Sequence, residues 1–257
     1  MLDRITPLIL TYNEEANIRR LLLSLTWAKR VVVIDSGSTD GTHSIVSEFR
    51  NANLYERKFD SHAAQWNFGI AETLIDTDWV LALDADYGLT DVFIAELARL
   101  DPGPAIAGYR AKFRYCIEGI PLRGGLYPPV TVLFRRRAAH YLQDGHTQRV
   151  RVGGETASLA HPLLHDDRKP LERWFASQIQ YMRQEARHLI DTPAAELRLP
   201  DRVRRLVVVA PALVFFHCLI VKGGLLDGRR GLFYSMQRAV AEAILSAFLV
   251  EVRLRRR

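Results

Sequence analysis

Three apolar runs constrain the fold of this chain most strongly. They are ITPLIL at residues 5–10, VVVID at residues 31–35 and WVLALD at residues 79–84. Segments with helical periodicity separate them, so strands and helices are expected to alternate along this part of the chain. Strands that are apolar on both faces and alternate with helices are typical of a parallel sheet covered by helices. The sequence therefore predicts an α/β fold with right-handed crossovers.

Carboxylates stand where two of these runs end. Asp35 ends one run, and Asp84 and Asp86 stand two residues apart at the end of another. Ligands of open α/β sheets bind at the carboxyl ends of the strands, so these side chains are expected to cluster at one edge. Mg²⁺ and Mn²⁺ prefer such oxygen ligands and usually keep substrate phosphates in their shell. The alternative for an aspartate-x-aspartate (DXD) pair is a turn or a helix cap.

The pattern changes after about residue 104. Short strands and loops with glycine and proline predict an α+β half, which ends in a long amphipathic helix over residues 168–190. The net charge of +6 suits anionic partners such as nucleotide phosphates or anionic lipid. Cys116 and Cys218 fit no metal spacing and predict a reducing compartment without disulfides. We expect no signal peptide at the start of the sequence.

Residues 206–221 form an apolar run that is interrupted by His217 and flanked by basic residues. The run has 16 residues, whereas a helix that spans a bilayer needs about 20, and Pro211 weakens it further. A hairpin or an interfacial helix fits better, with arginine and lysine side chains meeting anionic lipid. The alternative is a buried core helix.

Four motifs resemble those of family 2 glycosyltransferases with the GT-A fold. They are LILTYNEEANI, VVVIDSGSTDGT, QWNFGI and WVLALDAD, and their order and spacing match that family. The sequences GLYP and LFRR farther along are similar to those of lipopolysaccharide core and related envelope-polysaccharide transferases. The resemblance covers residue 5 to about residue 190. It implies a Rossmann-like, mostly parallel sheet flanked by helices, a nucleotide-sugar donor, a divalent metal ion (Mn²⁺ or Mg²⁺) and inversion at the anomeric carbon.

The resemblance also divides the chain into three parts. Residues 1–103 correspond to the nucleotide-sugar-binding half of a GT-A domain. Residues 104–192 correspond to the acceptor-binding half and carry the amphipathic helix. Residues 193–257 are expected to form a hydrophobic and basic helical appendage that associates with the membrane.

The residues that match the donor-binding motifs stand at strand ends and at one helix start. In the family, the first strand end grips uracil and ribose, the second reads the base edge, the DSGSTD loop binds the nucleotide and the QWN helix start lies near the donor sugar. The resemblance implies donor-binding roles for Thr11, Tyr12, Asn13, Glu14, Asp35, Ser36, Asp40, Gln65, Asn67 and Asp84. Helix capping is the alternative for Asp40, Gln65 and Asn67.

The metal-binding residues follow from the same resemblance. Asp86 would coordinate the metal ion, and Asp84 would contact the ribose or the metal-bound phosphate. His165 matches the family's histidine near the diphosphate or the metal ion better than His161 does, and a structural role is the alternative. Many relatives have glutamate directly after the aspartate pair, whereas this chain has Tyr87, which puts the local sugar contacts in doubt.

The catalytic base is a second departure from the family pattern. Inverting transfer needs a carboxylate or an imidazole to take the proton of the acceptor hydroxyl group. Alignment on the Arg149–Val150 pair puts Gln148 where the family has glutamate, and glutamine cannot accept that proton. Asp144 is the favoured substitute and His146 is the second. The alternative for the Asp144–Gly145 pair is an ordinary turn.

These features predict an inverting, metal-dependent hexosyltransferase at the cytoplasmic face of the inner (cytoplasmic) membrane. It would use a nucleotide sugar, with UDP favoured over GDP by analogy, to extend a lipid-linked glycan of lipopolysaccharide or another envelope polysaccharide. One alternative is sugar transfer to a polyprenyl phosphate. Another is a catalytically silent nucleotide-binding or scaffold protein, which Gln148 and Tyr87 motivate. No nucleic-acid partner is expected, because the basic residues cluster beside apolar segments.

Overall fold

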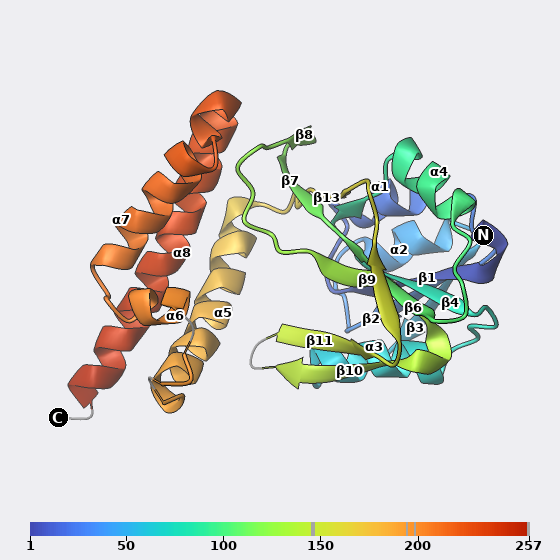
Figure 1. Ribbon diagram of the computed structural model, residues 1–257, viewed down its shortest axis with the longest axis horizontal. Helices are drawn as coiled ribbons and strands as arrows, with labels where there is room; N and C mark the ends of the chain where they lie inside the picture. The colour runs from blue at the N-terminus through green and yellow to red at the C-terminus, as the bar shows by residue number, and fades with distance from the viewer. Residues whose placement is uncertain (145–146, 194, 198, 256–257) are drawn as a thin grey trace. The chain divides into compact units, whose positions relative to one another are not determined.

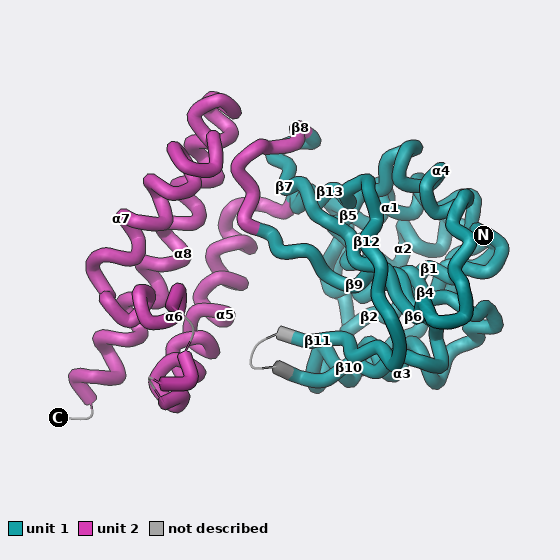
Figure 2. The backbone as a smooth tube through the Cα atoms, in the orientation of Figure 1, with its two compact units in different colours: residues 1–119, 127–168 teal, residues 120–126, 169–257 magenta. Residues whose placement is uncertain are grey.

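The chain folds into two compact units in the computed structural model. The model describes the backbone of residues 1–144, 147–193, 195–197 and 199–255. Unit 1 comprises residues 1–119 and 127–168, and unit 2 comprises residues 120–126 and 169–257 (Figure 2). Both halves of the expected GT-A domain therefore contribute to unit 1, whereas the long amphipathic helix belongs to unit 2.

The central element of unit 1 is a seven-stranded sheet (Figure 1). Its strands are β1 (Ile5–Thr11), β2 (Val31–Asp35), β3 (Ala52–Glu56), β4 (Trp79–Asp84), β6 (Ile106–Ala111), β9 (Val130–Arg135) and β12 (Glu155–Ser158). They are ordered β12-β6-β9-β4-β1-β2-β3, and β4, β1, β2 and β3 are mutually parallel. Strand β9 runs antiparallel to both of its neighbours. The expected α/β fold with a mostly parallel sheet is confirmed.

The alternation of side chains along each strand supplies one apolar core on each face of this sheet. Val31 and Val33 of β2 join a cluster with Leu21 and Leu22, whereas the intervening Val32 joins a second cluster on the other face. The helices that flank the sheet are α1 (Ile18–Leu23), α2 (Thr42–Ser47), α3 (His62–Ala71) and α4 (Asp91–Arg99). Short 3₁₀ turns η1 (Leu2–Arg4) and η2 (Arg136–Ala138) complete the helical segments of unit 1. Burial on both faces explains why these strands are apolar without alternation.

Helix α3 packs very closely on β1. An added Cβ at Gly69 would lie 2.7 Å from Cδ1 of Leu8, so a larger residue here would force the Leu8 side chain to shift. On the outer side of α3, the Trp66 ring stacks on Tyr141 with a centroid distance of 5.3 Å. Tyr141 belongs to a hairpin of β10 (Ala139–Asp144) and β11 (Thr147–Val152). The hairpin covers the helix and holds it against the sheet.

A smaller sheet of unit 1 brings distant segments together beside the carboxyl end of β4. It pairs β5 (Tyr87–Gly88), β13 (Leu163–His165) and β7 (Phe113–Ile117) in that order. The register sets His165 opposite Tyr87 on one side and opposite Tyr115 on the other. The pairing therefore fixes His165 next to the residues that follow Asp84.

Unit 2 is helical. Its elements are β8 (Ile120–Pro121), α5 (Leu171–Asp191), α6 (Leu199–Arg204), α7 (Val209–Phe216), the π-helical turn η3 (His217–Val221), the 3₁₀ turn η4 (Gly224–Asp227) and α8 (Gly228–Arg255). Helix α5 confirms the long amphipathic helix, and its apolar face packs on α8 through a buried cluster that includes Met182, Leu189 and Leu245. Arg204 bonds to the carboxylates of Glu185 and Glu242, which ties α6 to both long helices.

The apolar run over residues 206–221 becomes α7 and η3, with an outward face. Leu213, Phe216 and Ile220 are 52%, 55% and 59% exposed, which is not the pattern of a buried core helix. Within the described residues, no helix alone has the length and apolarity of a membrane span. The segments Val209–Val221 and Gly224–Arg255 meet those criteria only together, with a bend of 69° between them.

Candidate active site

The carboxyl ends of three neighbouring strands meet at one edge of the main sheet. Thr11 ends β1 in register with Asp35 of β2, and Leu10 is in register with Asp84 of β4. Strand β1 leads to β2 and β3 on one side, whereas β4 lies on its other side. This is the switch point at which open α/β sheets bind ligands. The expected gathering of Asp35 and Asp84 at one edge is thus found.

Asp86 and His165 form a close polar pair beside this edge. Their Oδ2 and Nε2 atoms are 3.1 Å apart, and both side chains are largely buried. Burial lowers the pKa of His165, but the charge of Asp86 and its hydrogen bond outweigh burial and raise the pKa overall. The carbonyl oxygen of Asp86 also accepts a hydrogen bond from the backbone N–H of Asp166. The segment that carries His165 is therefore joined directly to Asp86.

The geometry of this pair suits two ligands of one divalent cation. Adjacent ligands of an octahedral ion with bonds of about 2.1 Å lie about 3.0 Å apart, close to the 3.1 Å between Asp86 Oδ2 and His165 Nε2. In the described part of the chain, no three His, Cys, Asp or Glu side chains form a metal-binding group. Mg²⁺ commonly takes few protein ligands and completes its shell with phosphate and water. The pair fits that type of site.

Aromatic rings, including that of Tyr87, enclose His165. The rings of Tyr87, Tyr115 and Tyr127 lie 5.6, 4.9 and 4.9 Å from the imidazole, each with its edge toward a face. The hydroxyl groups of Tyr87 and Tyr127 are 2.9 Å apart. Burial raises the pKa of Tyr87 well above its usual value, so this residue stays neutral and packs against the histidine. His165 Nδ1 is buried with no hydrogen-bond partner among the described atoms.

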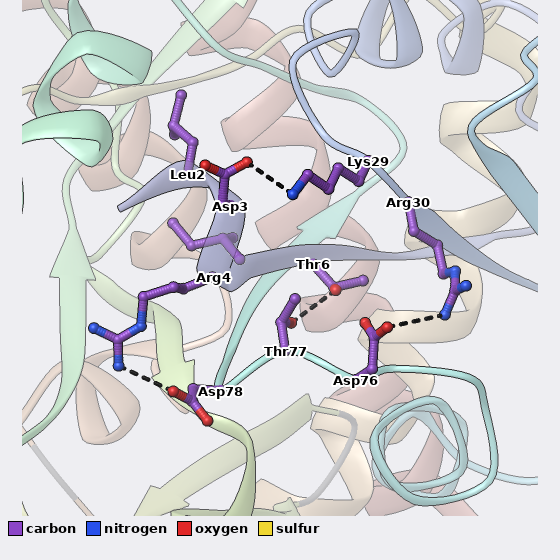
Figure 3. A pocket seen from close by; sticks show the side chains of 10 residues that line it. Leu2, Asp3, Arg4, Thr6, Lys29, Arg30, Asp76, Thr77 and Asp78 are labelled. Atoms are coloured by element: carbon purple, nitrogen blue, oxygen red, sulfur yellow. Dashed lines mark hydrogen bonds and ion pairs between the residues drawn. The ribbon is translucent and has the colours of Figure 1, made fainter.

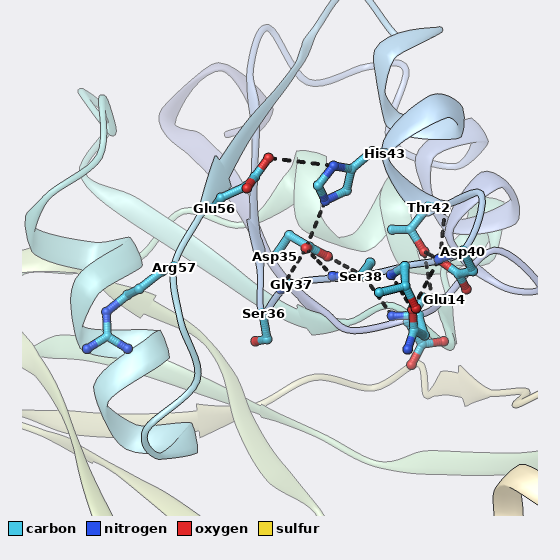
Figure 4. A network of polar contacts seen from close by, with 12 residues as sticks. Glu14, Asp35, Ser36, Gly37, Ser38, Asp40, Thr42, His43, Glu56 and Arg57 are labelled. Carbon is cyan, nitrogen blue, oxygen red and sulfur yellow. Dashed lines mark hydrogen bonds and ion pairs between the residues drawn. The ribbon is translucent and has the colours of Figure 1, made fainter.

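The carboxylate of Asp35 organises the loop that follows β2 (Figure 4). It accepts hydrogen bonds from the backbone N–H groups of Gly37 and Ser38, from Ser38 Oγ and from His43 Nε2. Burial raises the pKa of Asp35, but these hydrogen bonds outweigh burial and lower it overall. The side chain is fully buried. Its contacts are those of a loop anchor, and its role in reading the base edge stays a prediction.

The loops after β1 and β2 interlock. Asn13 has a left-handed backbone with φ of 54°, and its Oδ1 accepts a hydrogen bond from the N–H of Thr39. It therefore joins two loops instead of capping α1. Asp40 accepts hydrogen bonds from the N–H groups of Thr42 and Glu15, so it contacts the first residue of α2, whose N-cap is Gly41. This rigid pair of loops is the surface on which donor binding was expected.

The polar residues of the QWN motif have different partners. Gln65 is fully buried, and its Nε2 donates to Ser36 Oγ while its Oε1 accepts from Arg57. It links β2, β3 and α3 and is not a cap. Both amide atoms of Asn67 bond to the backbone of Tyr141. These contacts make Asn67 a clamp on the β10–β11 hairpin, and its expected role near the donor sugar stays a prediction.

At the end of β1, three expected donor contacts differ in exposure. Thr11 is buried, and its hydroxyl group has no hydrogen-bond partner among the described atoms. Tyr12 is 55% exposed. The carboxylate of Glu14 accepts a hydrogen bond from Asn17 Nδ2. Of these three residues, Tyr12 has the side chain most accessible to a ligand.

A buried network that the sequence did not reveal holds the His165 segment against α1. Asn17 is fully buried, and its Nδ2 donates to the carboxylates of Glu14 and Asp167 at 2.8 and 2.9 Å. Arg20 donates to the carbonyl oxygen of Asp166. The acidic pair after His165 in HDDRKP was the available signal, but its partners are about 150 positions away along the chain. Asn17 thereby connects the loop after β1 with the segment after β13.

The residues expected to act as catalytic base fall at the hairpin end. Asp144 is the last residue of β10, opposite Thr147, but its side chain and all of His146 lie outside the described part of the structure. Gln148 faces Gln143 across the two strands. His161 Nδ1 is 2.8 Å from a carboxylate oxygen of Glu96, and the preference for His165 as the functional histidine stays a prediction.

A pocket lies at the opposite edge of the sheet, where β1, β2 and β4 begin. It has a volume of about 500 Å³. Figure 3 shows three ion pairs lining it, of which Arg4 with Asp78 at 2.9 Å is the closest. Its charges are balanced and it lies at the amino ends of the strands. We therefore assign the site to the carboxyl edge with Asp84 and Asp86.

Part of the chain is similar to known glycosyltransferases. Residues 8–117 match the family model described as glycosyl transferase family 2. An uncharacterized glycosyltransferase of Rickettsia bellii (strain RML369-C) is 38% identical over 88 residues, which are 34% of this chain and 29% of that protein. The lipopolysaccharide core biosynthesis glycosyltransferase LpsC of Rhizobium meliloti (strain 1021) is 29% identical over 185 residues, which are 63% of this chain and 65% of LpsC. The chain thus spans less than two thirds of the length of these relatives.

A solved structure shares the fold. The glucosyl-3-phosphoglycerate synthase of Mycobacterium tuberculosis, in complex with Mn²⁺, UDP-glucose and phosphoglyceric acid, superposes with a TM-score of 0.50. It is 18% identical, and the match covers 70% of this chain and 77% of that one. With its mostly parallel sheet and flanking helices, unit 1 is a GT-A domain. The match over residues 8–117 shows that this part of the chain is similar to glycosyl transferase family 2.

Proposed function

We propose that this protein is an inverting glycosyltransferase that uses a nucleotide sugar, with UDP-sugar as the favoured donor. The pair of Asp86 and His165 at 3.1 Å, beside the switch point of the sheet, is the observation that carries this proposal. It supplies two ligands for a divalent cation where the family binds its donor. The similarity to LpsC supports a lipid-linked glycan of lipopolysaccharide or another envelope polysaccharide as acceptor.

The proposed reaction forms one bond and breaks another at the anomeric carbon. The acceptor hydroxyl oxygen attacks that carbon, the bond to the diphosphate breaks on the opposite face, and a base takes the hydroxyl proton. A cation held by Asp86 and His165 would neutralise charge on the leaving diphosphate. Asp84 would contact the ribose or phosphate. Asp144 is the proposed base and His146 is its rival.

The remaining donor contacts are proposed for the two interlocked loops and their neighbours. They comprise Thr11, Tyr12, Asn13, Glu14, Asp35, Ser36, Asp40, Gln65 and Asn67. The anchoring bonds of Asn13 and Asp35 suggest that these two act mainly by fixing loop shape. Tyr12 is the exposed member and has the ring that a nucleobase can stack on.

The proposed location is the cytoplasmic face of the inner membrane, with residues 193–257 providing the attachment. A lipid-linked acceptor would be concentrated at that surface. Residues 104–168 with the β10–β11 hairpin would contribute to the acceptor side. A catalytically silent nucleotide-binding protein is the second candidate, because Gln148 and Gln143 face each other where an acidic residue was expected.

The test is a transfer assay with radiolabelled UDP-, GDP- and dTDP-sugars, Mn²⁺ and a lipid extract of bacterial membranes. We expect label to enter the lipid fraction from one donor class, and an Asp86→Asn preparation purified in parallel to lack this activity. Donor binding without turnover would support the silent protein. Label in a product that mild acid releases as free sugar would indicate a polyprenyl phosphate acceptor. Absence of both binding and transfer would refute the proposal.

A further inference from the structure

The chain reversal between α7 and α8 carries a dense group of exposed apolar side chains. We define residues 220–233, which comprise the end of η3, η4 and the start of α8, as the apolar tip. Ile220, Val221, Leu225 and Leu226 are 59%, 72%, 61% and 70% exposed. Large apolar side chains exposed together usually mark a protein or membrane contact. The outward residues of α7 extend the same apolar character along the adjoining helix.

Close backbone packing keeps these side chains on the outside. An added Cβ at Gly231 would lie 2.0 Å from the carbonyl oxygen of Gly224, and one at Gly224 would lie 2.8 Å from that of Cys218. Gly223 and Gly228 have φ values of 81° and 58°, which favour glycine. The inner side of the reversal is therefore filled by backbone. The leucine side chains of η4 have no interior space to occupy, so the protein alone holds them on the outside.

Basic side chains surround the apolar tip. Lys222, Arg229 and Arg230 are all exposed. Asp227 is the single acidic residue in the sequence between residues 206 and 240, and its carboxylate accepts a hydrogen bond from the N–H of Arg123. The tip thus presents an apolar centre with an excess of positive charge. This combination complements a bilayer surface that contains anionic lipid.

We propose that the apolar tip is a binding site for anionic bilayer surfaces. Val221, Leu225 and Leu226 enter the boundary between headgroups and acyl chains, and the three basic residues contact lipid phosphates. A second copy of the chain is a poorer partner, because a two-fold contact would bring the same cations together. This proposal assigns the proposed membrane location to a specific surface of the protein. Its evidence is the structure of the apolar tip, and it does not depend on sugar transfer.

The test is sedimentation of the full chain with vesicles, without any nucleotide sugar. One vesicle type is phosphatidylcholine alone, and the other contains about 30% phosphatidylglycerol, which supplies the anionic surface. We expect strong binding to the anionic vesicles, weaker binding to the neutral ones and loss of the difference at high salt, because salt screens the attraction. Failure of the full chain to bind anionic vesicles would overturn the proposal.

Two variants separate the charged and apolar contributions. Lys222→Gln with Arg229→Gln and Arg230→Gln should weaken binding to anionic vesicles about a hundredfold, since each basic residue contributes roughly fivefold. Leu225→Ser with Leu226→Ser should weaken binding to both vesicle types by at least about tenfold. All five substitutions replace exposed side chains, so folding is preserved.

Matched controls change the same residue types in unit 1. Leu23→Ser with Leu74→Ser removes two exposed leucines, and Arg114→Gln with Arg137→Gln and Arg151→Gln removes three exposed charges. Vesicle binding should stay unchanged in the leucine control. In the charge control it should fall much less than in the tip variant that lacks the three basic side chains. Equal losses of vesicle binding in the tip variants and in the control variants would overturn the proposal. A dimer that forms without vesicles, and that only Leu225→Ser with Leu226→Ser dissociates, would also overturn it. Vesicle binding without sugar transfer would refute the proposed function but would still support the proposed role of the apolar tip.

Discussion

At the scale of single residues, Asp35 shows how one buried carboxylate can fix the shape of the loop that follows a strand. Its four hydrogen bonds come from three residues of the loop and helix that follow it. Loss of the charge would weaken each bond, because hydrogen bonds to ionised groups are about twice as strong as neutral ones. The loop is thus held in its shape by contacts within the protein alone.

We predict that Asp35→Asn lowers the free energy of unfolding by about 1–3 kcal/mol at neutral pH. The folded state lowers the pKa of Asp35 below its usual 3.8. The stabilisation is therefore complete above about pH 4 and is lost as the pH falls through the lowered folded value. Urea unfolding of both proteins at several pH values measures this difference. Asp76→Asn, at an exposed position, is the control, and an Asp35→Asn effect that persists undiminished at pH 2 would contradict the assignment.

The catalytic base gives the second prediction at this scale. Asp144→Asn should lower turnover at saturating donor by at least about a hundredfold, the usual contribution of a general base, while donor binding stays nearly unchanged. His146→Ala should be measured beside it. Near-normal turnover of Asp144→Asn with an inactive His146→Ala would move the role to the histidine. If both variants stay active, the base lies elsewhere and the alignment on Arg149 and Val150 is wrong.

At the scale of elements, the contact of α3 with β1 depends on a missing side chain. The Cβ of an alanine at position 69 would lie 2.7 and 2.9 Å from the two methyl carbons of Leu8. We predict that Gly69→Ala destabilises the protein by about 1–3 kcal/mol through overpacking, although alanine favours helices. Chemical denaturation measures the effect. Leu8→Ala in the same chain should relieve part of the Gly69→Ala cost, and additive losses would show that the two positions do not compete for space.

The same elements show how far the sequence can predict this structure. Strands β1, β2 and β4 can be predicted from their apolar runs, because burial on both faces leaves a continuous apolar segment. Helix α5 can be predicted from its periodicity, because burial of one stripe leaves a repeating pattern. The sheet edge that carries the candidate site can also be predicted from the sequence, since parallel strands place their carboxyl ends together. The contact of His165 with three tyrosines does not, because β13, β5 and β7 meet through pairing of short distant segments. Asn17 is likewise buried by partners that no local pattern encodes.

At the scale of the whole molecule, each unit has an apolar core of its own. The core of unit 2 joins α5 and α8, whereas the cores of unit 1 lie on the two faces of the sheet. Leu245 is fully buried in the helical core. Removal of α8 would therefore uncover the apolar face of α5. For this reason, point substitutions test the role of unit 2 better than a shortened chain does.

We predict two calorimetric unfolding transitions that respond to different perturbations. Leu245→Ala should lower the midpoint of one, because truncation of a buried leucine costs about 2–5 kcal/mol. UDP-sugar with Mn²⁺ should raise the midpoint of the other, since a ligand stabilises the unit that binds it. Leu206→Ala, at a position that is 58% exposed, is the control in unit 2. A single transition that shifts with both perturbations would contradict independent units.

The most direct measurement of the central claim is calorimetric titration of a UDP-sugar into the protein with and without Mn²⁺. If Asp86 and His165 hold the cation at the donor site, Mn²⁺ should strengthen donor binding to the wild-type protein. Asp86→Asn should lose this strengthening while keeping the weaker metal-free binding, and the control Asp76→Asn at the opposite edge should behave like the wild type. Equal strengthening by Mn²⁺ in Asp86→Asn and in the wild type would contradict the account.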